Sequence, residues 1–270
     1  MSQPDWIKKL EDQSGGKPVL VVEGNIDVSL LSRFLTQVSP GWETQFVMGS
    51  ATRKSRVIEA IRDYHPEWAG IIDTDEWPPN QVPEALKDTP TVKPLPRFCL
   101  ENYFCIPQEI WTALPENQRQ TLDNDPSRLQ EPILAKLSDW VAHGAMWRVI
   151  RKRRKGLLYE SSFSAELDRS PVTDLSEIRN ILTIWHDHLN PDQIIAKYQA
   201  ELNDAIKLSS IEQLKSYIHG KKFFRQVVTP NLNQLFSPTT ANDWLQRFGR
   251  NLVPPADLQE FLLNMVNLLT

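Results

Sequence analysis

The sequence has few cysteines and no long apolar run, and each shortage excludes a class of protein. Only two cysteines, Cys99 and Cys105, occur in 270 residues, which excludes a disulfide-stabilised framework and favours a reducing compartment. We expect both to be small buried apolar residues rather than nucleophiles. No apolar stretch is long enough to cross a bilayer, and residues 1–16 are polar and contain no apolar leader segment. These features predict a soluble, cytoplasmic protein that does not associate with a membrane.

The chain also lacks a net positive charge and a nucleotide-binding loop. Its formal charge is −4 at pH 7, so it has no global attraction for nucleic acid, and any nucleic-acid surface must be a local patch. It contains no Walker A loop, so any ATPase activity would have to come from a partner.

Short apolar runs alternate with amphipathic segments over the first 75 residues. This strand–helix–strand–helix–strand pattern predicts an α/β fold with a parallel sheet and right-handed crossovers. A turn is expected at Gly49 and Ser50, after the second strand. The expected elements are a short helix around residues 6–10, strands over 17–22, 44–48 and 68–72, and helices over 26–38 and 52–64.

The rest of the chain reads as a proline-rich connector followed by helices. The connector covers residues 77–96 and carries a short edge strand near 91–93. We expect a polar lead-in over 1–16, an α/β domain over 17–115, and then a mainly helical half over 116–270. That half is either a separate domain or an extension packing on the sheet. The expected helices cover 108–114, 129–155 (long or broken), 174–189, 191–208 after an Asn190 cap, 210–219, a segment opened by Ser237 and Pro238, and a last one to 270.

Acidic residues follow two of the predicted strands. Asp73 and Asp75 end the third strand, and Glu23 ends the first, with Asp27 in the first turn of the helix that follows. Neighbouring parallel strands end at the same edge of a sheet, so these four carboxylates can face one crevice. Clustered carboxylates repel unless a cation neutralises them, and oxygen ligands suit Mg²⁺.

Each acid also has an explanation without a metal. Asp73 and Asp75 lie where a turn begins, and Asp is a good turn residue. Asp27 favours the helix dipole, and Glu23 can be a solvated loop acid. The joint pattern, E-G-x-x-D after the first strand and D-x-D after the third, is harder to obtain by chance, so we favour a metal site.

These residues resemble the Toprim domain, which topoisomerases, bacterial primases and OLD-family nucleases share. The matching pieces are V-L-V-V-E-G-N-I-D at 19–27 and G-I-I-D-T-D at 70–75, and the resemblance covers about residues 17–105. Two further segments, F-C-L-E-N-Y-F at 98–104 and I-H-G-K-K at 218–222, resemble motifs of a Toprim-like prokaryotic family related to the OLD nucleases. Members of that family often accompany ABC- or SMC-type ATPases in anti-phage defence.

The resemblance implies a nuclease whose only cofactor is Mg²⁺ or Mn²⁺. Glu23 would bind metal or transfer a proton, the D-x-D acids would hold metal, and one of two lysines would lie near the scissile phosphate. No topoisomerase-type tyrosine domain or primase-type zinc cluster is recognisable, which disfavours those two chemistries. The implied metal ligands are Glu23, Asp27, Asp73, Asp75 and Glu101, and the implied catalytic residues are Glu23, Lys221 and Lys222.

We therefore expect metal-dependent phosphodiester hydrolysis of DNA or of RNA such as tRNA, by an effector of antiviral defence. The alternative is a non-catalytic module that docks on an ABC-type ATPase and keeps its acids for fold or metal binding. Against it, a degenerate domain would be expected to have lost Glu23, Asp73 or Asp75. The sequence leaves the choice of DNA or RNA, the number of ions and the oligomeric state open.

Two other charged segments carry weaker signals. A basic run at residues 148–155 can contact phosphates, but cations at the C-terminal end of a helix also interact favourably with the helix dipole. The His186-Asp187-His188 triplet is not expected to bind metal, because positions i and i+2 of a helix point in different directions. The basic run consists of Arg148, Arg151, Lys152, Arg153, Arg154 and Lys155.

Overall fold

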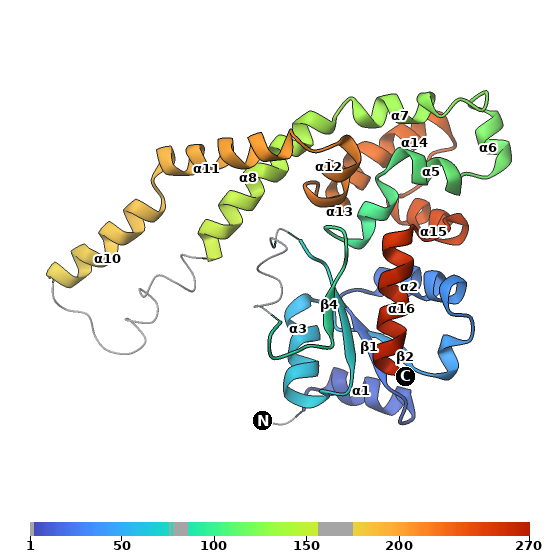
Figure 1. The fold of residues 1–270 in the computed structure, drawn as a ribbon, viewed down its shortest axis with the longest axis horizontal. Helices are drawn as coiled ribbons and strands as arrows, with labels where there is room; N and C mark the ends of the chain where they lie inside the picture. The colour runs from blue at the N-terminus through green and yellow to red at the C-terminus, as the bar shows by residue number, and fades with distance from the viewer. Residues whose placement is uncertain (1–2, 76, 78–85, 156–174) are drawn as a thin grey trace. The chain divides into compact units, whose positions relative to one another are not determined.

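The computed structural model describes residues 3–75, 77, 86–155 and 175–270 (Figure 1). The chain forms two compact units. The first combines Met1–Lys136 with Leu214–Thr270, and the second is Leu137–Gln213. The helices after Leu214 thus belong to the unit that contains the sheet.

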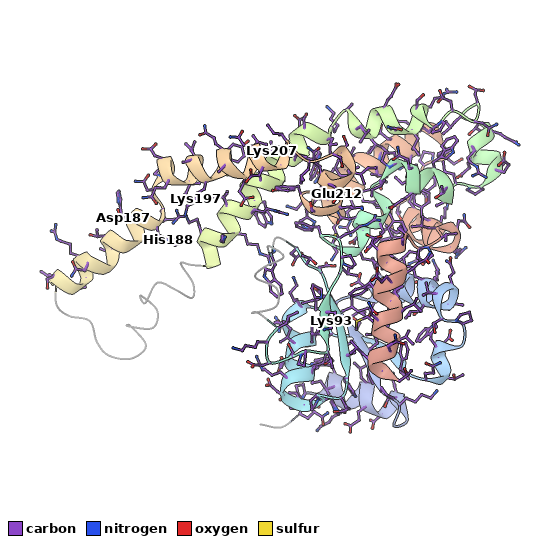
Figure 2. All side chains as sticks on the ribbon, in the orientation of Figure 1. Lys93, Asp187, His188, Lys197, Lys207 and Glu212 are labelled. Atoms are coloured by element: carbon purple, nitrogen blue, oxygen red, sulfur yellow. The ribbon has the colours of Figure 1, made fainter. Side chains whose placement is uncertain are left out.

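Four parallel strands form the sheet of the first unit, in the order β2-β1-β3-β4. The central strands β1 (Val19–Val22) and β3 (Ala69–Ile72) are buried along their whole length. Their residues are apolar on both faces, as in parallel sheets that are covered on both sides. The outer strands are β2 (Val47–Ser50) and β4 (Val92–Pro94), and Lys93 is exposed on β4 (Figure 2). The α/β class and the parallel sheet are confirmed.

Helices cover both faces of this sheet. On one face, α1 (Asp5–Ser14) and α3 (Lys54–Glu59) bury Ile7, Leu10 and Val57 against β1 and β3. On the other face, α2 (Asn25–Val38) packs on β1 and β2, and α16 (Ala256–Leu269) packs on α2 and β3 (Figure 1). A π-helical turn, Ala60–Tyr64, continues α3.

The second strand lies later in the sequence than expected. Residues Trp42–Thr44 form a 3₁₀ turn, and the strand continues through Gly49 and Ser50, where a turn was expected. A Cβ on Gly49 would lie 2.4 Å from Cδ2 of Leu10 on α1. Gly49 therefore allows a helix to approach the sheet closely, and it does not turn the chain.

The first unit contains further helices. One expected helix start, at Ser237 and Pro238, is wrong: α15 begins at Ala241. There, the Thr240 hydroxyl accepts a hydrogen bond from the Asp243 N–H and the Asp243 carboxylate accepts one from the Thr240 N–H, a capping box. These helices are α5 (Pro107–Ala113), α6 (Glu116–Gln120), α7 (Ser127–Leu134), α13 (Gly220–Phe223), a π-helical turn Phe224–Val228, α14 (Thr229–Leu235) and α15 (Ala241–Asn251).

The described residues of the second unit are mainly helical. It contains α8 (Leu137–Lys155), α10 (Leu175–His188) and α11 (Pro191–Ala205), and α8 packs against α11. Asn190 caps α11 as predicted, because its side-chain oxygen accepts hydrogen bonds from the N–H groups of Asp192 and Gln193. The helix α12 (Ser210–Ser216) leads the chain back to the first unit. In the described residues, no helix is both long and apolar enough to cross a membrane.

A buried arginine fixes the loop after β4. The Arg97 side chain donates hydrogen bonds to both carboxylate oxygens of Glu109 on α5, at 2.6 and 2.7 Å, and to both of Asp257 on α16, at 2.9 and 3.1 Å. Its guanidinium carbon lies 4.0 Å from the centre of the Tyr103 ring. Two carboxylates neutralise the buried cation, so this network joins the loop to two helices.

Candidate metal centre

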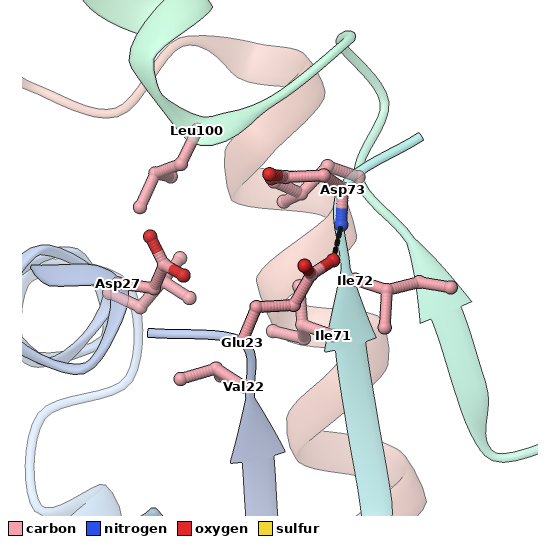
Figure 3. Close-up of a pocket in the computed structure, with 9 residues that line it drawn as sticks. Val22, Glu23, Asp27, Ile71, Ile72, Asp73 and Leu100 are labelled. Carbon is pink, nitrogen blue, oxygen red and sulfur yellow. Dashed lines mark hydrogen bonds between the residues drawn. The ribbon is translucent and has the colours of Figure 1, made fainter. Parts of the chain in front are cut away.

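Glu23 links the ends of the two central strands. It follows β1 directly, and its Oε1 accepts a hydrogen bond of 2.8 Å from the backbone N–H of Asp73, at the end of β3 (Figure 3). Burial and the nearby Asp73 carboxylate raise the pKa of Glu23 to about 7. The strand ends therefore lie close enough for one acid to bridge them, as the parallel sheet predicts.

Asp27 lies in the first turn of α2, near the ends of β1 and β3, and only 8% of this residue is exposed. Burial, together with the Asp73 and Glu101 carboxylates, raises its pKa to about 7. The preceding Gly24 leaves room for this carboxylate, because a Cβ there would lie 3.1 Å from Oδ2 of Asp27. The helix dipole favours Asp27 but does not explain why it lies among three other acids.

The two acids of the D-x-D motif point to different cations. The buried Asp73 accepts a hydrogen bond from Nζ of Lys221 at 2.9 Å, and Asp75 pairs with Nζ of Lys54 at 2.5 Å. Burial raises the pKa of Asp73, although Lys221 opposes the shift. Asp75 has a left-handed φ of 52°, and its N–H donates a 2.7 Å hydrogen bond to the carbonyl of Phe98. The two carboxylates therefore have different lysine partners.

Glu101 completes the group from η3 (Leu100–Phe104), the L-E-N-Y segment. Its residue is 6% exposed, and its Oε2 has no hydrogen-bond partner among the described residues. Burial raises the pKa of Glu101 to about 7, with Lys221 opposing the shift and Asp73 adding to it. An unsatisfied buried carboxylate oxygen is costly unless a ligand or a proton satisfies it.

Lys221 is the lysine of the H-G-K-K segment that enters the acidic group. Burial lowers its pKa, but the Asp73 and Glu101 carboxylates outweigh burial and hold the pKa above its usual value. Lys222 is exposed. Of the two lysines that the sequence left as alternatives, Lys221 therefore lies at the site.

A small pocket lies between the ends of β1 and β3, with a cavity volume of about 10 Å³, which is room for about one water molecule. Figure 3 shows the carboxylates of Glu23, Asp27 and Asp73 pointing toward this space from three different elements. Apolar side chains form the rest of its wall. These are Val22, Leu31, Ile71, Ile72, Leu95 and Leu100.

The carboxylates of this site are ligands that suit a hard divalent cation, but their positions in this structure do not form a ligand set. Within the described residues, no three His, Cys, Asp or Glu side chains are placed to hold an ion together. Asp73 is paired with Lys221 and Asp75 with Lys54, and these ion pairs account for part of the separation between the carboxylates. The donors are nevertheless all carboxylate oxygens, and the unsatisfied Oε2 of Glu101 is a free ligand atom, which suits Mg²⁺ or Mn²⁺.

The sequence analysis missed Lys54. It lies at the start of α3, after β2, and so contributes a cation at the same sheet edge as the acids. Its Nζ is also 4.6 Å from the centre of the Trp77 ring. The available signal was the T-R-K-S-R run at 52–56, which follows the second strand as the acids follow the first and third.

The basic run belongs to α8 of the second unit. Lys152 is exposed, whereas Arg153 contacts the other helices of that unit: its guanidinium lies 3.4 Å from Nδ1 of His188 and donates to Gln193 at 3.4 Å. The side chains of Arg154 and Lys155 lie outside the described residues. The run fills the last turns of α8, which agrees with the helix-end explanation and leaves phosphate binding a prediction.

His186 and His188 do not converge. His186 is exposed, whereas Nε2 of His188 lies 3.2 Å from the carbonyl of Arg153; Figure 2 labels His188 and Asp187 near the end of α10.

The two buried cysteines agree with a structural role. Cys99 lies beside Asn102, and Cys105 donates to the carbonyl of Glu101.

Comparison of this chain with protein-family models, with curated proteins and with solved structures finds no match.

Proposed function

We propose that this chain is a metal-dependent phosphodiesterase that acts on nucleic acid, built on a Toprim-like sheet. The observation that carries the proposal is the convergence of Glu23, Asp27 and Asp73 on one pocket at the carboxyl ends of β1 and β3. Nothing in the packing of a sheet requires two buried acids and a half-buried one there, and burial of unneutralised carboxylates is costly.

The residues that would hold Mg²⁺ or Mn²⁺ are Glu23, Asp27, Asp73 and Glu101, with Asp75 at the margin. A bound ion of this type polarises a phosphodiester and makes a bound water more acidic. Glu23, whose pKa is raised to about 7, can exchange a proton near neutral pH. Lys221 would stabilise the negative charge that develops on the phosphate.

A second candidate is a non-catalytic module that docks on an ABC-type ATPase. One observation favours it: Lys221 and Lys54 already neutralise Asp73 and Asp75, as acids kept only for the fold would require. The proposed roles as a nuclease effector in anti-phage defence and as an ATPase partner both rest on the family resemblance of the motifs.

Cleavage of plasmid DNA and of total tRNA, with Mg²⁺ or Mn²⁺, tests the proposal. Wild-type protein should cleave one of them, EDTA should abolish cleavage, and Glu23→Gln and Asp73→Asn should each lower the rate at least about 100-fold. Asp63→Asn is a matched control, because Asp63 is exposed and pairs only with its neighbour Arg62 in the described structure.

The outcomes separate the two candidates. Cleavage that survives Asp73→Asn would exclude this site as the source of activity. A folded wild-type protein that binds Mn²⁺ and cleaves neither substrate would favour the docking module. A folded protein that binds no Mn²⁺ would contradict the metal site itself.

A further inference from the structure

Two segments far apart in the sequence are joined beneath Lys221. Asn102, next to Glu101 in η3, is completely buried. Its Nδ2 donates hydrogen bonds to the carbonyls of Leu214, at 2.7 Å, and Ile218, at 2.9 Å. Its Oδ1 accepts a 3.0 Å hydrogen bond from the N–H of Cys99 in its own loop. Both amide hydrogens and the amide oxygen are therefore used, and one side chain ties the L-E-N-Y segment to the H-G-K segment.

Gly220 lies against the same side chain. A Cβ at this position would lie 2.3 Å from Oδ1 of Asn102 and 2.7 Å from its backbone nitrogen. Those atoms belong to a buried amide and to backbone, so neither can move easily. The glycine is required by close approach, because any side chain would push Gly220 away from Asn102.

Lys221 follows this contact immediately. A lysine side chain has four flexible carbon atoms and does not hold its ammonium group in place by itself. The short 2.9 Å contact between Nζ of Lys221 and Oδ2 of Asp73 therefore depends on where the backbone of residues 220 and 221 is held. The neighbouring Lys222 is exposed.

We propose that Asn102 and Gly220 form a joint that positions Lys221 against Asp73 and Glu101. The inference rests on the function proposed above, because it assigns Lys221 the stabilisation of the negative charge that develops on the substrate phosphate. Asn102 and Gly220 are positioning residues: they act through Lys221 and touch neither metal nor substrate. In this proposal, the L-E-N-Y and H-G-K segments act together to position Lys221.

A double-mutant cycle in Mn²⁺ affinity tests the joint without requiring any cleavage. Titrations at pH 8 would compare wild type, Asn102→Ala, Lys221→Met and the double variant. Lys221→Met should tighten Mn²⁺ binding at least about threefold, because it removes a cation beside Asp73. Asn102→Ala should shift the dissociation constant in the same direction, and should add less than about twofold in the Lys221→Met background.

Two matched controls separate positioning from general stability. Asn233 makes a comparable set of hydrogen bonds, to the backbone of Thr239 and to the indole N–H of Trp244. Asn233→Ala should lower the melting temperature and leave Mn²⁺ affinity unchanged. Gly220→Ala should reproduce Asn102→Ala, whereas Gly249→Ala, whose Cβ would lie 2.6 Å from Cδ2 of Leu30, should not.

Equal effects of Asn102→Ala in the two backgrounds would overturn the proposal, as would an unchanged Mn²⁺ affinity in Lys221→Met. If Asn102→Ala does not fold, Asn102→Ser and Gly220→Ala carry the same cycle. A wild-type protein that binds Mn²⁺ but cleaves nothing would defeat the proposed function and leave this test intact. If it does cleave, Asn102→Ala and Lys221→Met should lower kcat without additivity and change KM little.

Discussion

Three carboxyl groups in this chain, Glu23, Asp27 and Glu101, have a pKa raised to about 7. In the unfolded chain such groups titrate near 4. As the pH rises from about 4 to about 7, the unfolded chain releases these protons first, so the free energy of unfolding falls across that range. The stability that these groups contribute is present below pH 4 and lost as the pH passes through about 7.

This linkage predicts how the metal-free protein responds to pH. In EDTA, its melting temperature should be several degrees lower at pH 8 than at pH 5.5, since roughly 1–3 kcal/mol is lost. Saturating Mn²⁺ should raise the melting temperature more at pH 8 than at pH 5.5, because protons compete with the ion for the carboxylates. Thermal unfolding followed by circular dichroism measures both, and a higher melting temperature at pH 8 in EDTA would contradict the buried acids.

A single neutral replacement should separate stability from metal binding. Glu101→Gln keeps the shape of the side chain and removes a buried charge, so at pH 8 in EDTA it should stabilise the protein by roughly 1–3 kcal/mol. The same change should weaken Mn²⁺ binding at least about tenfold. The matched variant Glu116→Gln, at an exposed position, should change neither. A destabilised Glu101→Gln protein would show that the carboxylate serves the fold.

The positions of Glu23, Asp27, Asp73 and Asp75 along the sequence were enough to predict that they follow the strand ends. The contacts of these side chains were not predictable in the same way. The sequence left Lys221 and Lys222 as alternatives, because the contact between Lys221 and Asp73 joins residues 148 positions apart. It also could not pair Lys54 with Asp75, because that contact depends on β2 lying beside β1 at the same edge.

At the scale of elements, the loop after β4 depends on the Arg97 network. Arg97→Met would leave Glu109 and Asp257 without their buried cation, and breaking such a pair by removing one partner costs about 3–5 kcal/mol. Urea denaturation should show this loss. The control is Arg128→Met, because the Arg128–Asp123 pair is exposed and should contribute less than about 1 kcal/mol. Equal losses in the two variants would contradict a special role for Arg97.

Some elements follow from local pattern and others from distant contacts. The continuous apolar runs of β1 and β3 identify these strands from the sequence, since a strand buried on both faces is apolar at every position. The helical spacing of apolar residues identifies α2. The sequence predicts a turn at Gly49, but this residue lies in a strand. A glycine is needed there because the Leu10 side chain on α1 lies close to it. The 3₁₀ turn η3 has no periodic pattern at all, and it is held by Asn102 and Arg97.

At the scale of the whole molecule, the first unit is made from two stretches of chain. If residues 137–213 are replaced by a Gly/Ser linker of about 20 residues, with a reach of roughly 25 Å, the first unit should still unfold cooperatively. Its Mn²⁺ dissociation constant should stay within about threefold of wild type, because Lys221 and all the acids of the proposed site are retained. Chemical unfolding and Mn²⁺ titration check this. A deletion variant without a cooperative transition would show that the second unit is needed for the fold.

The ion pair between Asp73 and Lys221 spans 148 positions of the chain, and this separation has a consequence during translation. At about 5–20 residues per second, the ribosome makes Lys221 roughly 7–30 s after Asp73. The nascent polypeptide therefore carries its acids for many seconds without their lysine, and α16 follows later still. Any activity that requires this ion pair begins only after the chain has been made through Lys221.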